Sequence, residues 1–192
     1  MKIGIYGGSF NPIHKGHGEI VKYVLNNLPL DKIILVPVGI PPHKENSLAP
    51  SKLRCEMCKE ATKEIPKVEV SDIELEIKGP AYTIDTLKKL EKIYENAEFY
   101  LIIGEDSAQN FHTWREYKEI LEKYNVVVLK RKGYENPLKN EKCIVLNMPY
   151  FDISATEIRQ GIEEERDMSS VLSEGVLKII EKEKLYKKTA SI

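Results

Sequence analysis

The chain has 192 residues, of which 42% are hydrophobic and 31% are charged, a composition typical of a globular protein with a sizeable core. Its 29 Lys and Arg residues against 30 Asp and Glu residues give a net charge of -1, so nothing in the overall charge argues for nucleic acid or an anionic membrane as a partner. No apolar run approaches the roughly 20 residues of a membrane-spanning helix. Any binding site for an anion must therefore be built locally.

The three cysteines do not predict a disulfide framework, because their number is odd and low. Cys55 and Cys58 have the spacing of a metal or redox pair, but they fall within an amphipathic helical pattern and no second pair exists, so we interpret them as structural. The first residues, Met1–Tyr6, are typical of a strand and not of a signal peptide. These features favour a cytoplasmic location.

Segments typical of strands and of helices alternate along the chain. In the first half, the predicted elements are a strand at Lys2–Tyr6, a helix at His17–Leu28, a buried strand at Lys32–Val38, a proline-rich loop at Gly39–Pro50, a helix capped by Ser51 and an edge strand at Val68–Ile77. In the second half, they are a helix from Tyr82 or Thr83, a buried strand at Phe99–Ile103, short helices near Ser107–Phe111 and Trp114–Tyr124, strands at Val126–Leu129 and Cys143–Leu146, and helices from about Ser154 and Ser169.

This order predicts an α/β protein with a doubly wound, mostly parallel sheet and helices on both faces, a Rossmann-like arrangement. We expect one domain, residues 1–192, with a C-terminal helical portion from about residue 154. In such sheets, ligands bind beyond the carboxyl ends of the strands. Segments of unusual composition fall there, because Gly7–His17, Gly39–Lys44 and Gly104–Asp106 each follow a predicted strand.

The first candidate site is the segment after the first strand, GGSFNPIHKGH from Gly7 to His17. Glycines after a strand let the main chain approach a phosphate, and the start of the next helix offers free N–H groups. His14 and His17 lie three residues apart, so both can face one side of that helix. Neither a dinucleotide-binding glycine motif nor a P-loop is present. Ordinary turn glycines and a histidine pair for a metal are the alternatives.

Two other segments carry groups that could bind an anion. Residues 41–44 (PPHK) supply a cation, although a stiff surface loop explains the same residues. In the segment Ile153–Arg159 (ISATEIR), Ser154 and Glu157 have the spacing of a capping box, which is a complete structural explanation. The functional alternative is an anion clamp made by two hydroxyls, free N–H groups and the guanidinium of Arg159.

Two further segments, Tyr82–Thr86 and His112–Arg115, could shape a pocket for a flat ring. Trp114 is the only tryptophan, and it belongs either to the core or, at the mouth of a pocket, to a stacking platform. Asp106, at the end of a strand, could bind ribose hydroxyls or instead cap a helix.

Together these residues resemble the HIGH-motif nucleotidyltransferases and, within them, the bacterial nicotinate-nucleotide adenylyltransferases. Gly8–His17 is similar to the first motif of that family, and Ile153–Arg159 is similar to its ISSTxIR motif. The features that resemble the nicotinate branch are Pro41-Pro42-His43-Lys44, Tyr82-Thr83-Ile84-Asp85-Thr86, Ile103-Gly104-Glu105-Asp106 and Trp114. The segment Val176–Tyr186 resembles the last helix of the family, so the likeness covers nearly the whole chain. Two positions depart from the pattern: Asn11 stands where Asp is common, and Ala155 where Ser is common.

The resemblance implies a role for each motif. It assigns four residues to catalysis: His14, His17, Lys44 and Arg159. It assigns these residues to ATP: Gly7, Gly8, Ser9, Phe10, His14, Gly16, His17, Gly104, Asp106, Ile153, Ser154, Thr156 and Arg159. It assigns these residues to the mononucleotide: Ser9, Lys44, Thr83, Trp114 and Arg115. Trp114 would stack on the pyridine ring, and the N–H groups of Thr83 and Arg115 would recognise the nicotinate carboxylate.

The reaction that the resemblance implies is adenylyl transfer from ATP to nicotinate mononucleotide, which yields nicotinate adenine dinucleotide and pyrophosphate in NAD biosynthesis. Mg²⁺ would be carried on the ATP phosphates and would need no set of protein ligands. The expected partners are these two small molecules, with no nucleic acid and no membrane, and a homo-oligomer is compatible with the sequence. The alternatives are a related nucleotidyltransferase with another phosphorylated acceptor, a metal hydrolase using His14, His17 and His43, and a non-catalytic nucleotide-binding module.

Overall fold

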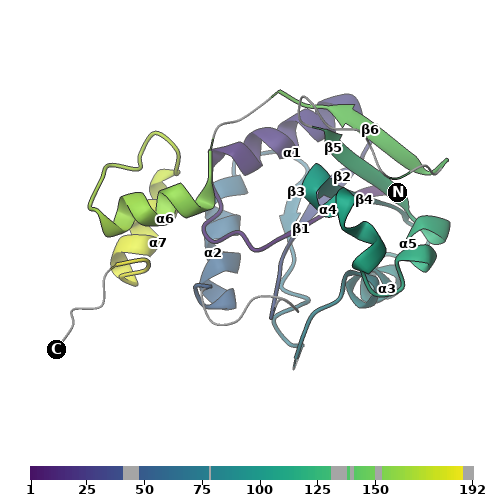
Figure 1. The fold of residues 1–192 in the computed structure, drawn as a ribbon, viewed down its shortest axis with the longest axis horizontal. Helices are drawn as coiled ribbons and strands as arrows, with labels where there is room; N and C mark the ends of the chain where they lie inside the picture. Colours follow the sequence, from purple (N-terminus) through teal and green to yellow (C-terminus); the bar gives the residue numbers. More distant parts are fainter. Residues whose placement is uncertain (41–47, 78, 131–137, 139–140, 150–152, 188–192) are drawn as a thin grey trace.

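The computed structural model describes residues 1–40, 48–77, 79–130, 138, 141–149 and 153–187. These residues form a six-stranded sheet in the order β3-β2-β1-β4-β5-β6, in which every neighbouring pair is parallel (Figure 1). The strands are β1 (Lys2–Gly8), β2 (Lys32–Pro37), β3 (Val68–Val70), β4 (Glu98–Gly104), β5 (Asn125–Lys130) and β6 (Cys143–Asn147).

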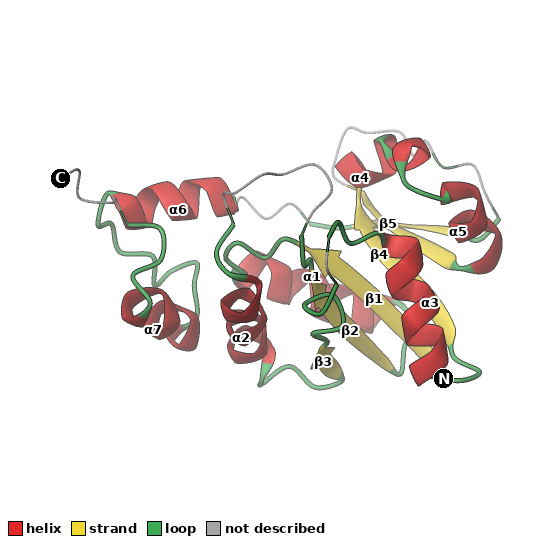
Figure 2. Ribbon diagram, turned by 90° about the horizontal axis from the view of Figure 1, so that it is seen from below, coloured by secondary structure: helices red, strands yellow, loops and turns green. Residues whose placement is uncertain are grey.

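Helices cover both faces of this sheet, which explains why the central strands are apolar on both sides. In β2, Ile33 and Leu35 belong to one buried cluster, whereas Ile34 and Val36 belong to the cluster on the opposite face. The helices that contribute to the first cluster are α1 (Lys15–Asn27), α2 (Ser51–Thr62), α6 (Ala155–Glu163) and α7 (Glu174–Lys182). Those that contribute to the second are α3 (Thr83–Ile93), α4 (Glu105–Gln109), the 3₁₀ helix η1 (Phe111–Thr113) and α5 (Tyr117–Lys123) (Figure 2). The prediction of a doubly wound parallel sheet is confirmed.

The crevice for a ligand arises at β1, where the strand order reverses. The chain passes from β1 to β2 on one side, and β4 pairs with the other edge of β1. The helix after β1 packs on one face of the sheet and the helix after β4 packs on the other, so the two connections diverge. In open parallel sheets this divergence leaves the space in which ligands bind. Gly8 and Gly104 are the last residues of these two strands.

The predicted edge strand Val68–Ile77 is at the edge of the sheet but is shorter than expected, because β3 ends at Val70. The chain then turns, and the N–H of Leu75 donates to the carbonyl of Asp72 over 2.8 Å. Apolar residues alternate again at Ile73, Leu75 and Ile77, but one position out of phase with Val68 and Val70. The sequence analysis treated both stretches as one strand. This turn is important for the site, because it contains Glu74, whose carboxylate is buried.

The last helix also begins later than predicted. It starts at Glu174 with Ser173 as its N-cap, not near Ser169. The carbonyls of Ser169 and Ser170 instead accept hydrogen bonds from Nζ of Lys15, at 2.9 and 3.0 Å. This contact holds the segment before α7 against the start of α1.

Smaller differences concern the residues at which three helices begin. The residue at the N-cap position of α2 is Pro50, and Ser51 is the first residue of the helix. The short helix predicted at 107–111 is α4, which begins at Glu105. The helix predicted from Trp114 begins only at Tyr117, because Trp114 closes η1.

The C-terminal helices α6 and α7 lie beside α2 at one side of the molecule (Figure 1). Ile158, Val176 and Ile180 from these helices share a buried cluster with Met57 and Cys58 of α2. One domain with a helical portion from about residue 154 stays a prediction, although this shared cluster agrees with it. Among the described helices, none has the length and apolar character needed to cross a membrane.

Candidate active site

The two histidines of the first motif lie together at the start of α1. His14 is the N-cap residue, and its main-chain N–H donates a hydrogen bond to Nδ1 of His17 over 3.2 Å. Their ring centroids are 3.8 Å apart with an interplanar angle of 37°. The expectation that the three-residue spacing brings both rings to one side of the helix start is confirmed.

Both imidazoles are neutral near neutral pH. Burial lowers the pKa of His14 to about 4, and burial together with the neighbouring His14 lowers the pKa of His17 to about 3. Because Nδ1 of His17 accepts a hydrogen bond, the proton of the neutral ring is on Nε2. In this protonation state His17 carries an N–H donor at Nε2.

The glycine between the histidines leaves room for this stacking. A Cβ atom at Gly16 would come within 3.0 Å of Nδ1 of His14 and 3.6 Å of Cδ1 of Ile153. Any side chain at this position would displace the His14 ring. The same distances place Ile153, from the other predicted motif, next to the histidine pair.

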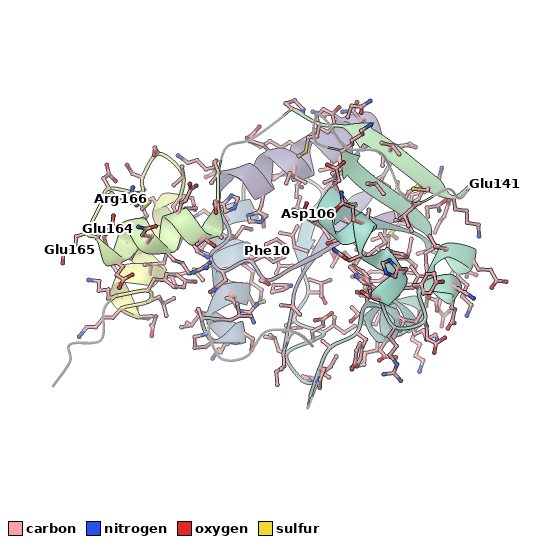
Figure 3. The ribbon with its side chains drawn as sticks, in the orientation of Figure 1. Phe10, Asp106, Glu141, Glu164, Glu165 and Arg166 are labelled. Carbon is pink, nitrogen blue, oxygen red and sulfur yellow. The ribbon has the colours of Figure 1, made fainter. Side chains whose placement is uncertain are left out.

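Phe10 supports the histidine pair from the protein interior. It is only 3% exposed, and its ring meets that of His17 edge-on at a centroid distance of 5.1 Å. Its φ of 43° lies in the left-handed region, which is unfavourable for a side chain of this size and is held by the surrounding packing. In Figure 3, Phe10 lies between the C-terminal helices and α4, which carries Asp106, whereas Glu164, Glu165 and Arg166 mark the far end of those helices.

The segment after β1 is tied to α6 by Arg159. Its Nη1 donates to the carbonyl of Asn11 over 2.8 Å, and its Nη2 donates to Oγ1 of Thr156 over 3.2 Å. The side-chain oxygen of Asn11 accepts from the N–H of Ala49 at 3.0 Å and from the hydroxyl of Tyr186 at 2.8 Å. The two predicted motifs, far apart in the sequence, are therefore joined in the structure.

The start of α6 does not contain the predicted capping box. Ser154 is the N-cap residue, and its carbonyl accepts the N–H of Ile158, but its hydroxyl makes no capping hydrogen bond. The first residues of a helix have N–H groups without partners inside the helix. The hydroxyl of Ser154 and these N–H groups are the donors of the predicted anion clamp.

The end of β4 is open to a ligand. A Cβ atom at Gly104 would meet no heavy atom within 4 Å, so packing of the protein does not explain the glycine. Gly104 is also the N-cap residue of α4, whereas Asp106 is exposed in the first turn of that helix. The alternative of Asp106 as a helix cap is wrong, and its carboxylate is accessible.

A pocket of about 220 Å³ lies at the carboxyl ends of β1, β2 and β4. Residues from both predicted substrate sets line it: Gly7 and Gly8 at the end of β1, Ser9 directly after it, Thr83 at the start of α3, and Trp114. Trp114 is partly buried, and its indole packs on Phe111 at a centroid distance of 4.9 Å. Trp114 therefore both packs against the core and forms part of the pocket wall.

The side chain of Arg115 lies outside this pocket. Its guanidinium stacks on the ring of Tyr82 at 4.9 Å and pairs with Asp85 at 3.4 Å, on the exposed surface. Only its main-chain N–H remains as the group predicted to recognise a carboxylate. Lys44, with Pro41, Pro42 and His43, lies outside the described residues.

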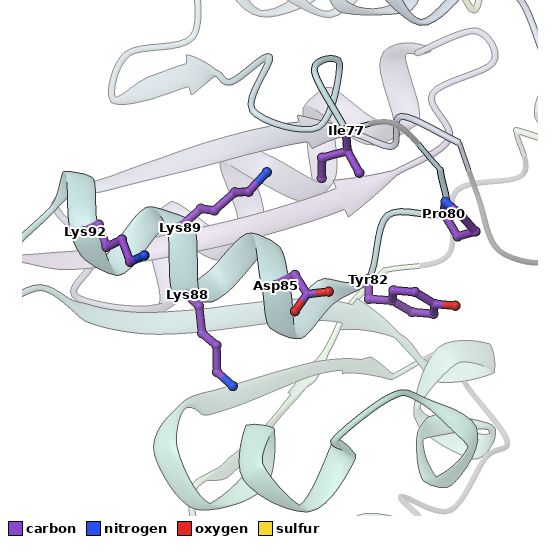
Figure 4. A pocket seen from close by; sticks show the side chains of 7 residues that line it. All are labelled: Ile77, Pro80, Tyr82, Asp85, Lys88, Lys89 and Lys92. Carbon is purple, nitrogen blue, oxygen red and sulfur yellow. The ribbon is translucent and has the colours of Figure 1, made fainter.

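A larger hollow of about 380 Å³ lies on the outer side of α3 and contains three lysines. Lys88 is paired with Glu119 at 2.9 Å, and the side chains of Lys88, Lys89 and Lys92 point in different directions (Figure 4). Because the ammonium groups do not converge, this hollow is a weaker candidate for an anion site than the pocket at the sheet edge.

Sequence comparisons identify the family. Residues 5–161 match the cytidylyltransferase-like family. A probable nicotinate-nucleotide adenylyltransferase from Fusobacterium nucleatum is 51% identical over 190 residues, which cover 95% of this chain and 98% of that protein. One from Dictyoglomus thermophilum is 39% identical over 194 residues, which cover 97% of this chain and 100% of that protein.

The chain belongs to the nicotinate-nucleotide adenylyltransferase family. Solved structures of low sequence identity share its fold. The Plasmodium falciparum nicotinic acid mononucleotide adenylyltransferase complexed with NaAD superposes with a TM-score of 0.82 at 23% identity, covering 96% of this chain and 97% of that chain. The same protein complexed with APC gives a TM-score of 0.78 at 22% identity, with 96% of each chain covered.

The sequence analysis missed two charged residues that are buried in the structure, Arg54 and Glu74. Arg54 is 1% exposed, and its guanidinium donates to the carbonyls of Ser9, Val38, Gly39 and Ala49 at 2.6 to 3.2 Å. It thus holds together the segments that leave β1 and β2. The signal that could have found Arg54 is its position three residues before Met57, on the buried face of α2.

The same buried face explains the two nearby cysteines. Cys55 and Cys58 are fully enclosed, and burial raises the pKa of each thiol. A thiol with a raised pKa is a poor nucleophile and a poor metal ligand. The interpretation of these cysteines as structural agrees with both observations.

Proposed function

We propose that this member of the nicotinate-nucleotide adenylyltransferase family transfers the adenylyl group of ATP to the phosphate of nicotinate mononucleotide, yielding nicotinate adenine dinucleotide and pyrophosphate in NAD biosynthesis. The observation that carries the proposal is the pocket in which the turn after β1, Thr83 and Trp114 meet. In the proposal, the adjoining part of the site is formed by the histidine pair, with Ile153 from the segment before α6 next to it.

The chemistry needs no nucleophilic side chain. The second pKa of a phosphate monoester is about 6, so the acceptor is largely a dianion at neutral pH and requires no general base. The enzyme must hold two anions in line and stabilise the charge that develops on the α-phosphoryl oxygens. In this proposal the N–H of His17 Nε2 and a donor on His14 bind that phosphoryl group, and Gly7, Gly8 and Gly16 let it approach the main chain.

The remaining phosphates of ATP would bind where α6 begins. Ser154, Thr156 and Arg159 supply two hydroxyls and a guanidinium, and Ile153 closes this side of the histidine pair. Arg159 now binds the carbonyl of Asn11, a neutral acceptor that a phosphate oxygen can replace. Lys44, which lies outside the described residues, is proposed as the second cation of the site.

The adenosine would lie at the end of β4. The open space over Gly104 accommodates the close approach of the ribose, and the exposed carboxylate of Asp106 can accept hydrogen bonds from its hydroxyls. Phe10 would take part through its main chain, because its ring is buried.

The pyridine ring of the mononucleotide would lie against Trp114. Thr83 is the first residue of α3, so its N–H has no acceptor within the helix and can donate to the nicotinate carboxylate. The N–H of Arg115 is proposed as the second donor, and Ser9 as a contact of the mononucleotide phosphate.

ATP is proposed to enter with Mg²⁺ on its phosphates, since Mg²⁺ tends to keep several waters and to bind substrate phosphates. The described residues contain no group of three or more His, Cys, Asp and Glu side chains that could hold a metal. The proposal requires no metal ligands from these residues. A cytoplasmic location and a homo-oligomer are also proposed, and light scattering of the purified protein tests the second.

The decisive experiment measures pyrophosphate release from ATP with nicotinate mononucleotide and, in parallel, with nicotinamide mononucleotide. We expect turnover with both ATP and nicotinate mononucleotide present and none when either is omitted. Turnover only with a different phosphorylated acceptor would favour another nucleotidyltransferase of this fold. Binding of ATP without turnover on any acceptor would favour a nucleotide-binding module.

A further inference from the structure

Glu74 places a buried carboxylate in the wall of the pocket at the sheet edge. The residue is 7% exposed and comes from the turn after β3. Its Oε1 accepts the hydroxyl of Thr86 over 2.6 Å, and its Oε2 accepts the N–H of Gly39 over 3.1 Å. Both oxygens act as acceptors, as those of a carboxylate do. The two contacts fix the position of a negative charge.

Glu74 is the only charged residue among the described residues that line this pocket. The other polar side chains of the wall are hydroxyls, and Trp114 contributes a large aromatic surface. A fixed carboxylate and an aromatic surface in the wall of one pocket together favour a flat cation. A site that favours a cation is unexpected here, because the proposed acceptor carries two anionic groups, a phosphate and a carboxylate.

The substrate resolves this difficulty, because the ring nitrogen of nicotinate mononucleotide is bonded to ribose and carries a positive charge. We propose that Glu74 is the countercharge for this pyridinium ring and makes the enzyme select cationic over neutral pyridine rings. The inference rests on the proposed function. In this arrangement Trp114 binds the ring face, the main-chain N–H groups bind the ring carboxylate, and Glu74 compensates the ring charge.

A purely structural role for Glu74 is the competing explanation. Its bond to Gly39 supports the chain where it leaves β2, and Arg54 binds the carbonyl of the same glycine. Loss of such a support would weaken every mononucleotide alike. Loss of a countercharge would weaken only ligands whose ring is charged.

The experiment compares nicotinate mononucleotide with its reduced form, whose dihydropyridine ring is neutral. Each is assayed by pyrophosphate release with the wild-type protein, Glu74→Gln and Thr86→Val. The glutamine keeps the size of the side chain and removes the charge. The valine keeps the charge of Glu74 and removes the hydrogen bond from Thr86. Thermal unfolding of each variant reports on folding.

For Glu74→Gln we expect a loss of kcat/KM for the oxidised mononucleotide of roughly tenfold or more, the scale of one adjacent opposite charge, with a much smaller loss for the reduced form. Thr86→Val should affect both forms equally. Equal losses for both forms in Glu74→Gln would overturn the proposal. If that variant does not fold, the wild-type preference decides, because equal kcat/KM for the two forms would also overturn it.

The outcomes separate this inference from the function on which it rests. Absence of wild-type turnover with nicotinate mononucleotide contradicts the proposed function itself. Normal wild-type turnover with no dependence on ring charge contradicts only the role of Glu74.

Discussion

The main-chain N–H of His14 determines which nitrogen of His17 carries its proton, through a hydrogen bond of 3.2 Å to Nδ1. The two rings lie 3.8 Å apart at an angle of 37° and are neutral near neutral pH, so in the proposed reaction the pair would act by directed N–H donation. The proposal therefore takes its positive charge from other side chains, such as Arg159, whose guanidinium binds the carbonyl of Asn11 in this segment.

The first prediction concerns the donor on His17. Replacing His17 by alanine should lower kcat by roughly 10² or more, the scale of losing one preorganised donor to a developing charge. The measurement is steady-state pyrophosphate release, with circular dichroism to verify the fold. His112→Ala, an exposed histidine of η1, serves as the matched control and should keep its activity. A His17→Ala enzyme with near-normal kcat would remove His17 from the mechanism.

The second prediction concerns pH and stability. The folded-state pKa values of about 4 for His14 and about 3 for His17 lie below the ordinary value of 6.5, so the unfolded chain binds more protons between these values. Stability from keeping the two rings neutral is therefore complete above 6.5 and is lost progressively as the pH falls toward 4 and 3. We expect the Tm to fall on acidification and to fall less steeply in a His14→Asn, His17→Asn double variant.

Thermal unfolding across this pH range, followed by circular dichroism, measures the effect. His112→Asn is the control and should retain the wild-type slope, because that side chain is exposed. Identical slopes in the wild type and the double variant would contradict the burial of neutral imidazoles.

The third prediction concerns Trp114. Its replacement by alanine should weaken binding of the mononucleotide by roughly 1–3 kcal/mol if stacking here resembles that on nucleic-acid bases. The KM for ATP should change much less, because the adenosine is proposed to lie at the end of β4. Trp114→Phe should recover most of the affinity. Unchanged affinity in the alanine variant would assign Trp114 to packing against Phe111 alone.

The fourth prediction concerns the buried guanidinium of Arg54. Arg54→Lys keeps the charge but cannot reach the four carbonyls that the planar guanidinium binds from several directions. Leaving even one or two buried acceptors unpaired should lower the free energy of unfolding by about 2 kcal/mol or more. Urea denaturation measures this change. Lys52→Arg, on the exposed side of the same helix, is the control, and equal losses in both variants would contradict the role of Arg54.

The sequence by itself determined the fold class and the order in which strands and helices follow one another along the chain. Apolar strands such as Phe99–Ile103, separated by helices with a single apolar face, can be buried only in a parallel sheet covered on both sides. Gly8 and Gly104, from two of the predicted segments, lie at the carboxyl ends of β1 and β4, because the ends of parallel strands meet at one edge of the sheet. The family resemblance was carried by these local segments and is confirmed by the comparisons.

Only the tertiary structure decided which polar groups make hydrogen bonds within the protein and which do not. The spacing of Ser154 and Glu157 is that of a capping box, yet the box does not form, and the apolar residues around Glu74 alternate again beyond the end of β3. Arg54 and Glu74 looked like surface charges because residues of these types are almost never fully buried unless paired. Their partners are main-chain groups and one hydroxyl from other parts of the chain. Such partners leave no trace in local sequence, because a carbonyl or an N–H is present at almost every position.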